Sequence, residues 1–148
     1  MKIYVASSWK NPMLNEVISS LRKSGHYVYD FRETGFSWLK QPHLWAPSRE
    51  VNKPSFYKAA NDGAVRAALS ADLQAFNAAD AVVAVLPCGR SSHIEIGMAI
   101  TRGIPVIMHH GMSDEDNIDL MHFHSSIMHT WNSLELEEEV NRAANRME

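Results

Sequence analysis

The sequence predicts an α/β protein, a three-layer sandwich in which helices cover both faces of a five-stranded parallel sheet. Segments rich in β-branched and aromatic residues alternate with segments whose apolar residues recur at helical spacing, and this alternation favours a parallel sheet. Residues 80–87 and 104–108 are apolar at almost every position, as in strands that are buried on both faces. The 148 residues have the size of one domain, so a single domain 1-148 is expected.

The first half of the chain contains two expected strands and one expected helix before a long irregular stretch. A strand is expected at residues 2–7, and a helix follows that begins at Pro12 and ends before Gly25. A second strand is expected at residues 26–31. Residues 32–57 are rich in aromatic side chains and long for a connection. They form either a functional loop or an irregular segment that covers the edge of the core.

The second half continues the alternation to the end of the chain. Residues 62–78 carry an apolar stripe that is typical of a long helix. The remaining elements are expected in the order strand 80–87, loop 88–93, helix 94–102, strand 104–108, helix 114–123, strand 127–131 and helix 134–146.

Five parallel strands joined by right-handed crossovers most simply adopt the order 2-1-3-4-5 of flavodoxin-like folds. In this order the chain reverses direction between strands one and three. Such folds bind ligands in the crevice beyond the carboxyl ends of these two strands. The loops expected there are residues 7–10 and 88–93, so we expect the functional site between them.

Composition and charge disfavour several classes of function. The formal net charge of -3 provides no basic surface for a nucleic-acid polymer. No apolar run approaches the roughly 20 residues that span a bilayer, and the N-terminus lacks the apolar segment of a signal peptide. Cys88 is the only cysteine and cannot form an internal disulfide, which fits a reducing compartment. We therefore expect a cytoplasmic protein that acts on a small molecule, with neither a membrane nor a nucleic-acid partner.

Glu95 is the most informative residue, and the pattern around it has two interpretations. Ser92 and Glu95 have the spacing of a capping box, in which the serine begins a helix and the glutamate bonds back to the serine N–H. Alternatively, a carboxylate at the crevice acts as a nucleophile. Only the second interpretation accounts for the glycine, arginine and serines of the adjacent loop.

The loop residues Gly89, Arg90, Ser91 and Ser92 have the character of an anion cradle. Glycine lets a ligand approach the backbone, N–H groups at a helix N-terminus attract phosphate or carboxylate, and arginine adds charged donors. The segment matches neither the P-loop nor the dinucleotide-binding glycine pattern. An ordinary strand-to-helix turn is therefore the alternative.

Other candidate residues carry weaker signals. Lys10 follows the first strand and either lines the crevice or is simply solvated, and Asp72 lies mid-helix, where an aspartate is usually solvated. The eight histidines lack the spacing of a metal site, so no metal is expected. Cys88 is either a nucleophile or a small buried apolar side chain.

Several segments of the chain match the motifs of one known family, in the same order and with the same spacing over most of the chain. They are residues 3–9 (IYVASSW), 72–73 (DL) ahead of 79–82 (ADAV), and 95–99 (EIGMA) followed by 103–106 (GIPV). Together they resemble the nucleoside 2-deoxyribosyltransferase family, whose superfamily includes nucleoside 5′-monophosphate N-glycosidases. The resemblance implies cleavage or transfer at the N-glycosidic bond of a nucleoside or nucleotide, without a cofactor.

The resemblance also implies roles for single residues. Glu95 would attack the anomeric carbon, Asp72 would help to protonate the departing base, and Tyr4 would orient the glutamate. Trp9 would form part of the base pocket. These roles fit the chemistry, because an oxocarbenium-like transition state needs a carboxylate at the sugar and an acid at the leaving group.

One position departs from the family pattern. Transferases of the family place an aspartate six residues before the nucleophile, and the monophosphate hydrolases a serine, whereas this chain has Gly89. Because Arg90 and two serines lie next to it, a phosphorylated ligand is favoured over an unmodified sugar. Ser7, Trp9 and Lys10 complete the substrate-binding residues that we expect.

The sequence leaves other function classes open. A non-catalytic nucleotide-binding or sensing module on the same fold is one alternative. A TIR-like NAD glycohydrolase is another, although Tyr4 and residues 95–99 argue against it. The resemblance further implies a homodimer, for which tryptophans and methionines offer apolar surface. It does not distinguish a hydrolase from a transferase.

Overall fold

The computed structural model describes residues 1–44, 55–110 and 119–146, which belong to two compact units. Met1–Asp30 and Ala78–Glu148 form one unit, which we call the sheet unit. Phe31–Asn77 form the other, which we call the helical unit. The single domain 1-148 expected from the sequence stays a prediction.

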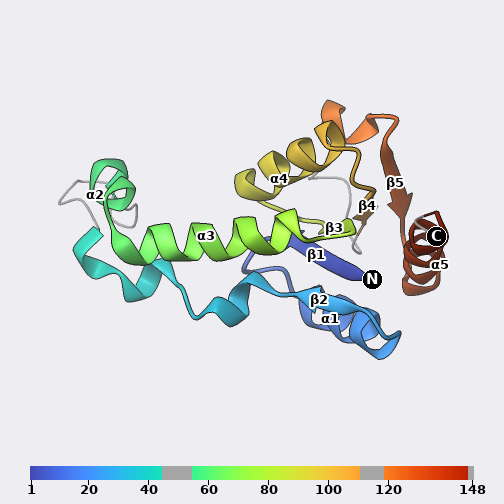
Figure 1. The fold of residues 1–148 in the computed structure, drawn as a ribbon, viewed down its shortest axis with the longest axis horizontal. Helices are drawn as coiled ribbons and strands as arrows, with labels where there is room; N and C mark the ends of the chain where they lie inside the picture. The colour runs from blue at the N-terminus through green and yellow to red at the C-terminus, as the bar shows by residue number, and fades with distance from the viewer. Residues whose placement is uncertain (45–54, 111–118, 147–148) are drawn as a thin grey trace. The chain divides into compact units, whose positions relative to one another are not determined.

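The sheet unit is built on five parallel strands in the order β2-β1-β3-β4-β5, which confirms the predicted order (Figure 1). The register places Tyr4 of β1 opposite Tyr29 on one side and Val82 on the other. β2 and β3 therefore lie on opposite sides of β1, so the direction in which the chain adds strands to the sheet reverses between β1 and β3. The strands are β1 Lys2–Ser7, β2 Tyr27–Tyr29, β3 Ala81–Val85, β4 Val106–His109 and β5 Ile127–Thr130.

The central strand β3 has no polar side chain. Its five residues are completely buried, and β4 beside it is buried along its whole length. β-Branched valines suit a pleated strand, and a strand with apolar residues at successive positions can be buried only if both of its faces are covered. The sequence of β3 therefore requires a layer of helices on each side.

Helices lie on both faces of this sheet and complete the predicted α/β sandwich (Figure 1). α1 Leu14–Lys23 and α5 Ser133–Asn145 lie on one side and contact each other, and the Ser20 hydroxyl donates to Glu137 at 2.8 Å. α4 Arg90–Thr101 lies on the other side and packs on β1, β3 and β4. The apolar stripe that predicted α1 is its buried face, formed by Leu14, Val17, Ile18 and Leu21.

The first turn of α4 corrects a sequence prediction. The helix was expected at 94–102 after a loop at 88–93, but it begins at Arg90. Gly89 precedes it with extended backbone and provides no side-chain cap. The buried Ser92 hydroxyl donates to the Ser7 carbonyl at 3.3 Å. This contact with β1 stabilises the first turn, and local sequence patterns do not report such a contact.

Two further boundaries differ from the sequence predictions. β2 covers only Tyr27–Tyr29 instead of residues 26–31, because these are the three residues that pair with β1 at the edge of the sheet. The first half of the helix expected at 114–123 lies outside the described residues. Its last part is the short 3-10 helix η4, Leu120–Phe123, which begins after Asp119.

The helical unit contains 3-10 turns and α-helices in its described part. α3 agrees with the helix predicted at 62–78. Residues 45–54, which include Trp45 of the aromatic stretch, lie outside the described residues, and the role of this stretch stays a prediction. The elements are η1 Phe31–Thr34, η2 Trp38–Lys40, η3 Pro42–Leu44, α2 Phe56–Ala60 and α3 Gly63–Asn77.

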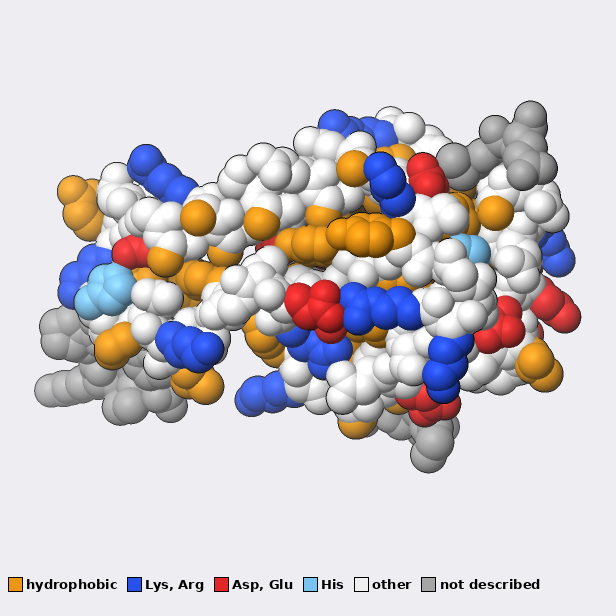
Figure 2. All heavy atoms as spheres, turned by 60° about the horizontal axis from the view of Figure 1, so that its bottom comes forward, with side chains coloured by type: hydrophobic (Ala, Val, Ile, Leu, Met, Phe, Trp, Pro, Cys, Tyr) orange, Lys and Arg blue, Asp and Glu red, His pale blue; other side chains and the backbone are white. Residues whose placement is uncertain are grey.

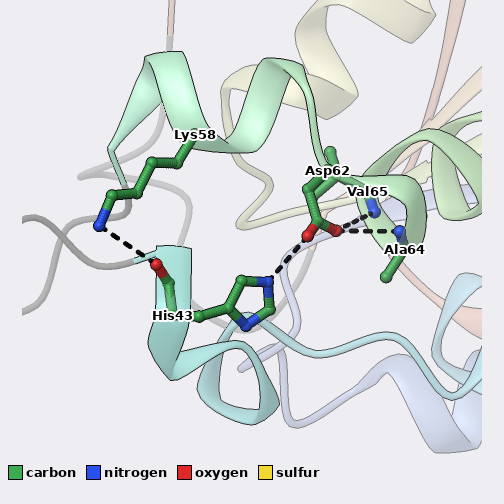
Figure 3. Close-up of polar contacts among 5 residues, drawn as sticks. All are labelled: His43, Lys58, Asp62, Ala64 and Val65. Carbon is green, nitrogen blue, oxygen red and sulfur yellow. Dashed lines mark hydrogen bonds and ion pairs between the residues drawn. The ribbon is translucent and has the colours of Figure 1, made fainter.

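Asp62 begins α3 by capping it (Figure 3). One of its carboxylate oxygens accepts from the N–H groups of Ala64 and Val65 at 2.9 and 3.1 Å, and the other lies 2.8 Å from His43 Nε2. The hydrogen bond with His43 and the one from the Val65 N–H lower the pKa of Asp62 below its ordinary 3.8. The Lys58 ammonium donates to the His43 carbonyl at 3.4 Å, so this cluster joins η3, α2 and α3.

Replacing Asp62 with alanine is expected to loosen the first turn of α3, because two backbone N–H groups lose their acceptor. Amide hydrogen exchange at Ala64 and Val65 should become several-fold faster, whereas Asp62→Asn, which keeps an acceptor oxygen, should change it less. In the wild type, the ionised Asp62 carboxylate stabilises the folded state above pH 3.8. This stabilisation is lost as the pH falls through the lower pKa that Asp62 has in the folded state. Unchanged protection in Asp62→Ala would contradict this assignment.

Candidate active site

The candidate site of the sheet unit lies where β1 and β3 end. Ser7, the last residue of β1, lies opposite Val85, the last residue of β3. The Ser7 hydroxyl donates to the Val85 carbonyl at 2.8 Å. The site is expected between two segments, and both begin at this pair of strand ends, since residues 8–10 follow β1 and residues 86–89 connect β3 with α4.

Asn11, the residue before the expected helix start at Pro12, joins the strand ends. Its buried amide group donates to the Ser7 hydroxyl at 3.0 Å and to the carbonyls of Val85 and Pro87 at 3.1 and 3.3 Å. Its side-chain carbonyl accepts the Met13 N–H at 2.9 Å. A carbonyl beyond a strand end needs a partner in place of water, and Asn11 supplies it. The local Asn-Pro pattern gave no sign of partners 74 residues away.

Tyr4 and Glu95 are brought together by this arrangement. The Tyr4 hydroxyl donates to Glu95 Oε1 at 2.8 Å across 91 residues of sequence. Tyr4 is 1% exposed in β1 and its ring stacks on Tyr29 with centroids 5.5 Å apart, whereas Glu95 is half-buried. Because the phenol is buried and packed against Tyr29, its bond to one carboxylate oxygen orients the carboxylate of Glu95.

The capping-box interpretation of Ser92 and Glu95 was wrong. Since α4 begins at Arg90, Ser92 lies within the helix, and no acidic residue occupies the first turn. Glu95 belongs to the second turn and bonds to Tyr4 of β1. The carboxylate is therefore held against the sheet by a tertiary contact rather than by the helix end.

The predicted anion cradle divides into two parts. Gly89, Arg90 and Ser91 are exposed at the N-terminus of α4, where N–H groups and a positive helix dipole favour an anion. Ser92 and Ser7, by contrast, are buried, and their hydroxyls donate to backbone carbonyls. The two buried serines hold the strands and the helix together, so only the first three residues offer exposed groups to a ligand.

The three other predicted site residues are Trp9, Lys10 and Asp72. Trp9 and Lys10 are exposed in the turn after β1, with Trp9 47% exposed. Asp72 is half-buried in α3 of the helical unit. The roles expected for these three residues stay predictions.

Cys88 lies beside the candidate site and is not activated. Burial raises the pKa of its thiol to about 11, and the negative charge of Glu95 raises it as well. The Cys88 sulfur lies 3.9 Å from Nδ1 of His93. A thiol with this pKa is protonated at neutral pH and is a poor nucleophile. Of the two interpretations of Cys88, the buried apolar side chain is favoured.

Metal ligands do not gather in the part of the chain that the structure describes. There, no three histidine, cysteine or carboxylate residues are placed to hold a metal ion. Four histidines instead form two pairs, His93 with His122 and His110 with His129. Sequence reasoning missed both pairs, since their members come from different elements.

The surface charge and the length of the helices relate to two kinds of partner, nucleic acids and membranes. On the face drawn in Figure 2, Lys and Arg side chains are interspersed with Asp and Glu side chains among the described residues. Of the helices within residues 1–44, 55–110 and 119–146, none has the length and apolar character needed to cross a membrane.

The fold is similar to two solved enzyme structures. A 2-deoxyribosyltransferase from the psychrotolerant bacterium Bacillus psychrosaccharolyticus superposes with a TM-score of 0.61 and 21% identity, over 93% of this chain and 90% of that one. The CMP N-glycosidase BcmB of Clostridium botulinum superposes with a TM-score of 0.51 and 16% identity, over 96% and 98%. No family model and no curated protein matches the sequence. At these identities the likeness shows the fold, and both neighbours agree with the family that the sequence resembles.

Replacing Asn11 with aspartate is expected to destabilise the sheet unit by about 2–4 kcal/mol, because a buried carboxylate would face the Val85 and Pro87 carbonyls. Both carbonyls would lose the amide donor, although the Val85 carbonyl would still accept the Ser7 hydroxyl. Chemical denaturation of the purified protein measures this free energy. The matched control is Asn61→Asp, since Asn61 is exposed and its side-chain amide donates to the Tyr57 carbonyl. An equal, small effect of both substitutions would show that the Asn11 network contributes little to stability.

Cys88 is expected to react slowly with iodoacetamide. A rise in thiol pKa from 9.0 to about 11 lowers the thiolate fraction near pH 8 on the order of 100-fold. Mass spectrometry of the native and the denatured protein should show this difference in alkylation rate. Glu95→Gln should accelerate alkylation, since one cause of the raised pKa is removed. Alkylation at the rate of a free thiol would contradict the assigned environment.

Proposed function

We propose that this protein cleaves or transfers the N-glycosidic bond of a (deoxy)nucleoside or a nucleoside 5′-monophosphate, with Glu95 as the nucleophile. The observation that carries the proposal is the hydrogen bond from buried Tyr4 to half-buried Glu95. It holds a carboxylate beside the carboxyl ends of β1 and β3, where folds of this topology bind ligands. The fold shared with a deoxyribosyltransferase and a CMP N-glycosidase supports the same reaction class.

The proposed reaction has two steps. In the first, a Glu95 carboxylate oxygen bonds to the anomeric carbon as the bond from that carbon to the base nitrogen breaks. The electron pair stays on the base, which takes up a proton, and Asp72 is the donor that the family resemblance suggests. In the second step, water or another base attacks the same carbon, loses a proton and releases Glu95 as a carboxylate. Water gives hydrolysis, and a second base gives transfer.

Substrate binding is assigned to the loops that follow β1 and β3. Trp9 offers an exposed aromatic face for a base, and Lys10 lies next to it in the same turn. Arg90 and Ser91, with the N–H groups at the start of α4, suit a 5′-phosphate. The absence of a carboxylate at Gly89 removes a charge that would repel this phosphate. A homodimer and a cytoplasmic location remain expectations from the sequence.

The proposal is tested by incubating the protein with deoxynucleosides, ribonucleosides and their 5′-monophosphates, with and without a second free base. Chromatography measures the released or exchanged base. Glu95→Gln and Glu95→Ala should fall to background, because both remove the nucleophile. Tyr4→Phe should lower kcat by about 10–100-fold, the cost of losing the hydrogen bond that orients a catalytic group.

Control measurements separate lost chemistry from lost folding. Circular dichroism and thermal unfolding of each variant should resemble those of the wild type, and Lys23→Gln, an exposed substitution at the end of α1, should keep full activity. Nucleotide binding without turnover, unaffected by Glu95→Gln, would overturn the proposal and support the non-catalytic binding module instead.

A further inference from the structure

Two histidines from different elements face each other beside the first turn of α4. His93 belongs to α4 and the buried His122 to η4, and their Nε2 atoms lie 2.9 Å apart. The ring planes differ by 16° and the ring centroids are 5.1 Å apart. The two Nε2 atoms therefore lie close to the line that joins the centroids. This is the geometry of a direct, in-plane hydrogen bond between two imidazoles.

The partners of the other two ring nitrogens determine where the protons lie. His122 Nδ1 accepts the Asp119 backbone N–H at 3.2 Å, so it carries no proton and Nε2 carries one. His93 Nδ1 lies 2.7 Å from the Gly89 carbonyl, which can only accept, so Nδ1 is protonated and Nε2 is not. The His122 Nε2–H therefore donates to His93 Nε2. All four nitrogens are used, and the pair is uncharged.

This arrangement has no place for a further proton. On His93 Nε2, the new proton would face the N–H of His122. If His122 moved its own proton to Nδ1 in order to accept, that proton would face the Asp119 backbone N–H. One added proton therefore breaks either the bond between α4 and η4 or the bond that caps η4.

The surroundings of His122 also oppose a positive charge. Burial and then the neighbouring His93 lower the pKa of His122 below 6.5. His110, which follows β4, and His129 of β5 act in the same direction, and the nearby Asp119 carboxylate opposes them. His110 and His129 bond to each other, with His110 Nε2 2.8 Å from His129 Nδ1.

We propose that the His93–His122 pair positions the candidate active site, holding the start of α4 against η4 only while both rings are uncharged. The effect on rate rests on the proposed function. Glu95 lies two residues after His93 in the same helix, and the carbonyl that His93 bonds belongs to Gly89, the residue before α4. When acid breaks the pair, the first turn of α4 loses this support. The orientation of Glu95 against Tyr4 loosens, and base release slows.

The kinetic test compares the wild type with His122→Gln and His122→Phe. Glutamine donates to His93 Nε2 through its amide and does not gain a proton, whereas phenylalanine fills the space and removes the bond. In the wild type, kcat for base release should fall up to about tenfold per pH unit below the titration of the pair. His122→Gln should keep its kcat to lower pH, and His122→Phe should have a low kcat throughout. His26→Gln, which removes another histidine whose pKa burial lowers, should keep the wild-type profile.

A second readout does not need activity. NMR titration of the His93 and His122 ring protons is combined with amide hydrogen exchange over residues 90–95. Protection of these amides should fall as the pair gains a proton, and this fall should be absent in His122→Gln. A His122 ring with an unshifted pKa and unchanged protection, or the same acid limb in the wild type and His122→Gln, would overturn the proposal. Loss of protection without any turnover would refute the proposed function while supporting the role of the pair in holding α4.

Discussion

The hydrogen bonds of Asn11 at the ends of β1 and β3 are the constraint on which the candidate site depends. A parallel sheet leaves the carbonyls beyond its strand ends without ladder partners, and these groups must be satisfied before a helix can pack over them. The Asn11 amide satisfies the carbonyls of Val85 and Pro87, and the Ser92 hydroxyl satisfies that of Ser7. The start of α4 is thereby fixed relative to β1, which is the geometry that the bond between Tyr4 and Glu95 requires.

Because Tyr4 is buried in β1 and Glu95 lies in α4, their hydrogen bond depends on how α4 is positioned along the sheet. Burial raises the pKa of the nearby Cys88 thiol, and the negative charge of the same carboxylate raises it further, so the thiol stays protonated. The carboxylate to which we assign the reactivity of the site thus adds to the effect of burial, which is the main cause of the inertness of the cysteine. The placement of the Glu95 carboxylate, rather than the number of charged residues, distinguishes this edge of the sheet from the rest of the sheet unit.

The histidines of the sheet unit illustrate a second constraint, the number of protons that a pair of hydrogen-bonded imidazoles can hold. The chain has eight histidines without the spacing of a metal site, and two pairs of them form hydrogen bonds in the structure, His93 with His122 and His110 with His129. An imidazole pair of this kind links two elements strongly while it is neutral and repels when it is charged. Such a link suits a position where a helix end and a following segment need to stay together at neutral pH.

The sequence by itself determined the order of the strands and most of the elements. β3 is apolar at every position and can only be central, and the stripe from Leu14 to Leu21 can only face the sheet. Residue patterns also drew attention to Glu95, and the family resemblance paired it with Tyr4. Only the tertiary structure decided where α4 begins, what Asn11 bonds and which histidines meet. Local patterns record the burial of a residue and its neighbours within one or two turns. Hydrogen bonds between residues far apart in the sequence leave no such periodic signal, because only the folded chain brings their partners together.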